Sequence, residues 1–231
     1  MYLNPKNIVV DFLRSKIPDP RNRATQNTET FTSVLDQDFI QLTAPSNSVD
    51  YIETLEIDGT ELTKWKDYAP DFDKQGIKLF TPLAAGLSIE VTYWYGKGWI
   101  FPDKPYLKLN AESFPRISVM MLSSPTMRLG NYEAPTESVM MLQIDIWVKE
   151  KQDGQVFEID GIYYSGEKLA DIIGYTITNA FEDFEESLFP VLYGFQASSY
   201  PIDLPYDEDL QTYHKSITIE LRGLNIGRIE V

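Results

Sequence analysis

The segment 165–186 constrains the fold more than any other part of the chain, because its apolar residues recur at helical spacing. They form one continuous stripe, and Ser165 is a favourable residue for the cap at its start. The stripe consists of Leu169, Ile172, Ile173, Ile177, Ala180, Phe181 and Phe184. A helix with such a stripe has to be covered by another apolar surface. The segment therefore predicts an amphipathic helix packed on a sheet.

Three segments supply that sheet, because their apolar and polar residues alternate as in half-buried strands. These segments are 114–122, 139–149 and 212–222. The side chains expected toward the core are Ile117, Val119, Met121, Leu142, Ile144, Ile146, Val148, Ile217, Ile219 and Leu221. The stretch 123–138 between the first two strands has no periodicity and predicts a long loop, as does the acidic stretch 196–211.

The second face of the predicted sheet carries Met120, Met141 and Trp147. We expect these three residues to form a subunit interface, since Met and Trp are enriched in interface cores. Packing under an N-terminal helix is the alternative for the two methionines. The helix itself is predicted over residues 5–17 by its apolar spacing, and Pro18 follows it directly.

Short alternating segments between residues 31 and 95 predict a small β-sandwich. Asp58 and Gly59 form the dipeptide of a tight hairpin turn. In 51–57 the alternation places Tyr51, Leu55 and Ile57 on one side. Polar residues over 21–30 and Gly- and Pro-rich residues over 96–105 predict linkers on either side of the sandwich.

The predicted fold class is therefore α+β, with an antiparallel sheet flanked by helices. Residues 1–28 and 100–231 would form this domain, and residues 29–99 would form an all-β sandwich inserted into it. A net charge of −15 disfavours binding to nucleic acid or to anionic membranes. The chain has no cysteine, so disulfides and thiolate chemistry are excluded. Its first twenty residues do not have the pattern of a signal peptide, and we expect a soluble protein made in the cytoplasm.

His214 is the single histidine, and it falls on the predicted outer face of the last strand with Ser216, Thr218 and Glu220. We expect a solvated strand residue; a general base is the alternative, which needs a nucleophile and a pocket. Two acidic clusters predict solvated loops in preference to calcium sites. They are Asp67, Asp71 and Asp73, and Asp207, Glu208 and Asp209. No catalytic, cofactor or metal site is expected, and the chain is predicted not to be an enzyme.

The order of elements in the α+β part resembles the tail-terminator, or tail-completion, proteins of tailed phages and related viruses. The order runs from "FLRSKI" through "FPRISV", "MLQIDIWVK" and "GEKLADIIGYTITNAF" to "YDEDLQTYHKSITIEL". The middle segment is similar to immunoglobulin-like modules of virion proteins, through Ile57-Asp58-Gly59 and "PLAAGLSIEVTYWY". The resemblance implies a hexameric ring that caps the tail tube and meets the head–neck complex.

The first hypothesis is thus a structural virion protein at the tail–neck junction, assembled in the host cytoplasm. Its partners would be copies of itself, the tail tube and the head–tail connector, without sequence-specific nucleic-acid binding and without a membrane. A head–tail connector or another virion component is an alternative. A second is a carbohydrate- or surface-binding module acting through the β-domain, with aromatic residues near Trp94 and Trp99. A third is a hydrolase that uses acidic residues with His214.

Overall fold

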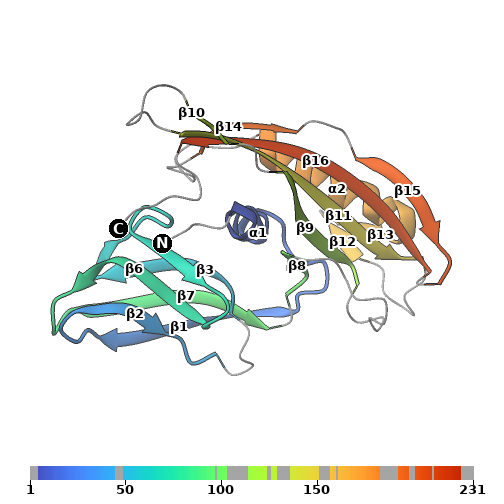
Figure 1. The fold of residues 1–231 in the computed structure, drawn as a ribbon. Coiled ribbons are helices and arrows are strands. Elements are labelled where there is room, and N and C mark those ends of the chain that lie inside the picture. The colour runs from blue at the N-terminus through green and yellow to red at the C-terminus, as the bar shows by residue number, and fades with distance from the viewer. Residues whose placement is uncertain are drawn as a thin grey trace. The chain divides into compact units, whose positions relative to one another are not determined.

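The computed structural model describes most of the chain, in two units. The described residues are 5–44, 49–96, 98–102, 114–123, 126–128, 136–150, 157–159, 161–182, 192–197, 201–209 and 211–224. Unit 1 comprises Met1–Arg21 and Trp99–Glu230, and unit 2 comprises Asn22–Gly98. Figure 1 shows the two units and labels most of their elements.

Unit 2 consists of two antiparallel sheets with one apolar core between them. One sheet has the strand order β1-β7-β3-β4 and the other has the order β2-β6-β5. The strands are β1 (Ala24–Thr32), β2 (Gln37–Gln41), β3 (Val49–Ile57), β4 (Thr60–Glu61), β5 (Tyr68–Asp71), β6 (Gly76–Leu83) and β7 (Ser88–Gly96). Ile52 and Leu55 of one sheet and Ile77 and Leu79 of the other are buried in the shared core. An inserted all-β domain is compatible with this arrangement.

The segment 21–30 is not the linker that its polarity predicted, because most of it belongs to strand β1. This strand pairs with β7 along its whole length, from Ala24 opposite Gly96 to Thr32 opposite Ser88. Its polar residues are tolerated because Asn27 and Glu29 have partners. Both are hydrogen-bonded to the hydroxyl of Tyr93, and Glu29 also accepts the backbone N–H of Thr43.

Unit 1 is built on one large sheet with the strand order β14-β16-β11-β9-β8, in which β10 also pairs with β11 and β15 also pairs with β16. The strands are β8 (Ile100–Phe101), β9 (Arg116–Ser123), β10 (Thr126–Arg128), β11 (Thr136–Lys149), β14 (Leu192–Ala197), β15 (Ile202–Asp207) and β16 (Thr212–Leu224). Among the described strands of this sheet, β8 and β9 pair in parallel and the other pairs are antiparallel. The strands β12 (Phe157–Ile159) and β13 (Ile162–Tyr164) form a separate hairpin.

The two helices are α1 (Pro5–Lys16) and α2 (Gly166–Glu182), which confirms both predicted helices over these residues. Helix α2 lies against β11 and β16, as Figure 1 shows. The helix residues Leu169, Ile173 and Ile177 are buried, and so are the predicted core residues of β11 and β16. The Phe12 and Phe181 rings stack with centroids 5.1 Å apart, so α1 contacts α2 directly.

One buried cation attaches helix α2 and strand β15 to the sheet. Lys215 of β16 is only 4% exposed, and its Nζ lies 2.6 Å from a carboxylate oxygen of Asp171 on α2. The same Nζ also pairs with Asp203 on β15. Burial on its own would lower the pKa of Lys215, but hydrogen bonds to the two carboxylates outweigh it and raise the pKa above 10.5.

The predicted α+β class, with helices flanking an antiparallel sheet, is wrong. The chain is mostly β, with several sheets and two helices among the described residues. The expected loops contain strands: β10 lies within 123–138, and β15 lies within 196–211. Strand β15 escapes the pattern analysis because most of its side chains are exposed, so it has no apolar alternation to detect.

Candidate functional site

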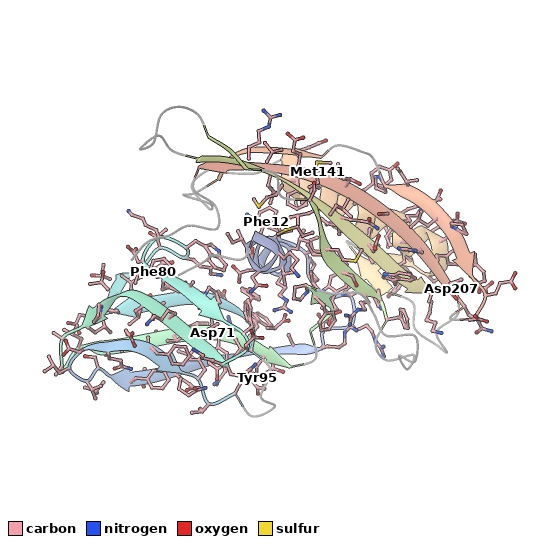
Figure 2. All side chains as sticks on the ribbon, viewed as in Figure 1. Phe12, Asp71, Phe80, Tyr95, Met141 and Asp207 are labelled. Atoms are coloured by element: carbon pink, nitrogen blue, oxygen red, sulfur yellow. The ribbon has the colours of Figure 1, made fainter. Side chains whose placement is uncertain are left out.

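The face of the large sheet that points away from α2 carries a row of polar side chains, and we treat it as the candidate site. It is called the second face below. Strand pairing places on it Arg116, Ser118 and Met120 of β9, Met141, Gln143, Asp145 and Trp147 of β11, and His214, Ser216, Thr218 and Glu220 of β16. Figure 2 shows the side chains of this sheet and labels Met141.

His214 lies on the predicted face, but it is not the solvated residue that the alternation predicted. Its side chain is 13% exposed, and its ring stacks on Trp147 with the centroids 3.6 Å apart. Strand pairing sets Trp147 directly opposite His214, so the two rings cover each other. The partner across the strands, which a single strand's pattern does not reveal, determines the burial of His214.

Asp145 is the most deeply buried acid of the second face, with a side chain that is 2% exposed. Its Oδ1 lies 3.3 Å from Nε2 of His214 and accepts a hydrogen bond of 2.7 Å from Nε2 of Gln143. Burial alone would raise the pKa of this carboxyl. Polar contacts with His214, Gln143 and Ser216 outweigh burial and hold the pKa below 3.8.

A second charge, Arg116, lies one strand away on the same face. It is 7% exposed, its Nε donates to Oγ of Ser118 at 3.4 Å, and its guanidinium lies 3.8 Å from the ring centroid of Phe101. Ser118 is opposite Asp145 across the β9–β11 pair. The cation and the carboxylate therefore both belong to one polar row that crosses the sheet.

This row has one feature in common with a catalytic site, namely a carboxylate that contacts a histidine. In the present geometry the Nε2 of His214 contacts Asp145, and one face of the ring is covered by Trp147. Among the residues that the structure describes, no side chain bonds to the other ring nitrogen of His214. The contacts with Asp145 and Trp147 therefore orient and pack the imidazole of His214, and they do not connect it to a nucleophile.

The three residues predicted as a subunit interface all lie on the second face and are all half-buried. Met120 and Met141 are neighbours, because Met120 pairs with Gln143 and Met141 pairs with Ser123. Trp147 lies six residues further along β11, at about 20 Å from Met141 by strand geometry. The structure therefore brings the two methionines together at one end of the sheet and leaves Trp147 at the other.

The sequence patterns did not predict the exposure of two apolar residues beside these methionines. Met121 is 38% exposed and Leu122 is 53% exposed. Met121 had been expected in the core with Ile117 and Val119, which are both fully buried. A bulge between Met141 and Leu142 leaves Leu122 outside the strand pairing near the end of β9.

The acidic clusters behave as turn residues where the structure describes them. Asp67 accepts the backbone N–H of Thr63 at 2.8 Å, and Asp71 accepts that of Lys74 at 3.0 Å. Within the described ranges no group of three His, Asp or Glu side chains could hold a metal ion. Trp99, expected near a ligand surface, is 2% exposed, and its carbonyl accepts the N–H of Ile117 in unit 1.

Comparison with known proteins does not assign the chain to a family. No protein-family model matches the chain, and no curated protein matches it significantly. Neither helix of the described part is long and apolar enough to cross a membrane.

Proposed function

We propose that the chain is a structural subunit of a virus particle at the tail–neck junction. Copies of it would form a hexameric ring that caps the tail tube and joins it to the head connector. The order helix, strand, strand, helix, strand in unit 1, represented by α1, β9, β11, α2 and β16, supports this role. The observation that carries the proposal is that opposite edges of the large sheet both expose apolar side chains.

The first edge is the end of β9, and we call Met120, Met121 and Leu122 the β9 edge. On the side away from β11, strand β8 pairs only with Ile117 and Ser118. No described strand pairs with the remaining residues on that side. The segment Ser118–Ser123 contains no charge and no proline, the residues that usually prevent an edge from pairing with another chain. This edge is therefore suited to contact with another polypeptide.

The second edge is strand β15, which pairs with the side of β16 that faces away from β11. Ile202 is 55% exposed and Tyr206 is 37% exposed on it. In a closed ring each subunit presents two different surfaces, one to each neighbour. Because the β9 edge and the β15 edge differ and lie at opposite sides of one sheet, they can meet head to tail between successive copies.

The charge of the chain favours apolar contacts between copies. Each copy carries a net charge of −15, so copies repel one another over most of their surface. A stable contact has to bury side chains without adding further repulsion. The β9 edge has no ionisable residue, and Asp203 on the β15 edge already pairs with Lys215. Asp207 also lies on β15, but repulsion across the contact stays low because the β9 edge carries no charge.

The test uses two double variants and a matched control, measured by sedimentation velocity. Met121→Glu with Leu122→Glu disables the β9 edge, and Ile202→Glu with Tyr206→Glu disables the β15 edge. Each variant alone is expected to remain a monomer at concentrations where the wild type assembles. Val34→Glu with Leu35→Glu, which alters side chains that are 63% and 71% exposed in unit 2, adds the same charge and is expected to leave assembly intact.

Mixing the two defective variants gives the sharper result. Each of them retains one intact edge, so a head-to-tail contact predicts one-to-one dimers that cannot grow into rings. Assembly of either single variant into full rings would contradict the proposal, and so would a mixture that stays monomeric. Retention of the ring on isolated tail tubes, and not on heads, then distinguishes a tail terminator from the adjacent connector.

A further inference from the structure

The outward face of the β1-β7-β3 sheet in unit 2 carries two parallel aromatic rings beside an oriented carboxylate. Strand pairing sets Trp94 of β7 between Gln26 of β1 and Tyr51 of β3. The rings of Tyr51 and Trp94 are inclined by only 11°, with centroids 6.2 Å apart. Both rings are part-exposed, and they lie on the face opposite to the core residues Ile52 and Tyr93.

Two β-bulges create this surface. The pairing of β3 with β7 shifts between Val49 and Tyr51, and again between Ile52 and Thr54. The sequence alternation placed Tyr51 on the same side as the core residue Leu55, and that prediction is wrong because the second bulge inserts Glu53 between them. Bulges commonly re-aim side chains beside binding sites. Here they direct both Tyr51 and Glu53 outward.

The carboxylate of Glu53 is held in one orientation by two side-chain donors. Nε1 of Trp94 donates to its Oε2 at 2.9 Å, and Nε2 of Gln26 donates to the same oxygen at 2.6 Å. The other oxygen, Oε1, has no partner among the described residues. Glu53 is exposed, so Oε1 can accept a hydrogen bond from a bound hydroxyl group without prior rearrangement.

Neighbouring groups on the same face are hydroxyls and one amine. Thr28 and Thr92 lie directly opposite each other, with their hydroxyl oxygens 3.0 Å apart. Nζ of Lys64 lies 5.6 Å from the centroid of the Tyr51 ring and donates to the carbonyl of Ile52. The surface therefore combines the two aromatic rings with an amine over the Tyr51 ring and with donors and acceptors at their margin.

This combination matches the chemistry of a pyranose ring. One face of a neutral sugar presents C–H groups, which pack on the electron-rich faces of aromatic rings, while its hydroxyls need donors and acceptors at the edge. Glu56 lies opposite Glu90 further along the same face, so an anionic polymer would be repelled. We propose that the Tyr51–Trp94 face of unit 2 is a binding site for a neutral polysaccharide. This inference does not depend on ring assembly.

The test is affinity electrophoresis of the full chain through native gels that contain hydroxyethyl cellulose, amylose or a soluble β-1,3-glucan. At least one of these neutral polymers is expected to retard the wild type, and Trp94→Ala is expected to abolish the retardation. Tyr175→Ala removes an aromatic side chain that is 59% exposed on helix α2, and this control should migrate like the wild type. Equal thermal unfolding midpoints confirm that each variant is folded.

A conservative variant separates the carboxylate from the rings. Glu53→Gln keeps the size of the side chain, and it is expected to weaken retardation several-fold while leaving the folded structure intact. The proposal is overturned if none of the three polymers retards the wild type. It is equally overturned if Trp94→Ala is retarded as strongly as the wild type, because binding would then occur elsewhere on the chain.

Discussion

Replacing Asp145 with asparagine tests whether the buried polar row of the second face stabilises the fold. The side chain keeps its shape but loses its charge, and an NH2 group replaces one of its two acceptor oxygens. His214 and Gln143 both approach Oδ1, at 3.3 and 2.7 Å. Leaving a buried donor without an acceptor costs about 1–3 kcal/mol. We therefore expect Asp145→Asn to lower the free energy of unfolding by about 3 kcal/mol at pH 7.

The pH dependence of this loss follows from the pKa of Asp145. That pKa is lower in the folded chain than its ordinary value of 3.8, so the ionised carboxylate stabilises the fold above pH 3.8. The contribution is lost as the pH falls through the folded-state pKa, because the wild type then protonates the same group. The difference between wild type and variant should therefore be full at pH 7 and should shrink below pH 3.8.

Urea unfolding followed by circular dichroism at a series of pH values measures both effects. Asp209→Asn is the control, since it removes the same charge from an exposed turn residue. It should change the free energy of unfolding by less than about 0.5 kcal/mol. Equal stability of the Asp145 and Asp209 variants at pH 7 would refute the reasoning. A loss for Asp145→Asn that is as large at pH 2.5 as at pH 7 would refute the charge argument.

Two further substitutions test the packing of each unit. Replacing both Asp171 and Asp203 with alanine leaves the Lys215 ammonium buried without a counter-ion, and urea unfolding should show a loss of about 3 kcal/mol in the free energy of unfolding. Lys215→Met leaves two part-exposed acids instead, so its loss should be smaller. Because the pKa of Lys215 is raised, its contribution should be full below pH 10.5 and lost as the pH rises through the folded-state pKa. Gly76→Ala would place a Cβ 2.4 Å from the carbonyl oxygen of Ile40, and we expect a loss of about 1–3 kcal/mol that thermal unfolding detects.

The elements that sequence patterns predicted well are those with one buried face and many residues. Helix α2 and strands β11 and β16 each carry a continuous apolar face, so their positions follow from periodicity alone. Polar strands at the sheet edges, such as β1 and β15, lack that signal. Many of their side chains face solvent and their backbone is paired on one side, so nothing in their composition distinguishes them from loops. Because such strands were not predicted, the predicted fold class was α+β, whereas the observed fold is mostly β.

The candidate sites show the same division. The alternation placed His214 on the correct face, but its burial depends on Trp147 across the strand pair, and no single strand contains that information. Tyr51 was placed on the wrong face because bulges break the period of two, and single residues that cause a bulge have no strong sequence signature. The outward pair of aromatic rings could therefore not be predicted until the register of β3 and β7 was known.

The solution mass of the wild-type chain tests the central claim of assembly most directly. Light scattering on a sizing column, over a range of protein concentrations, should find a species near six chains of 26.5 kDa each. Its fraction should rise with concentration, and the charged substitutions at Met121 and Leu122 should remove it. A mass of one chain at every concentration, unchanged by those substitutions, would contradict the account.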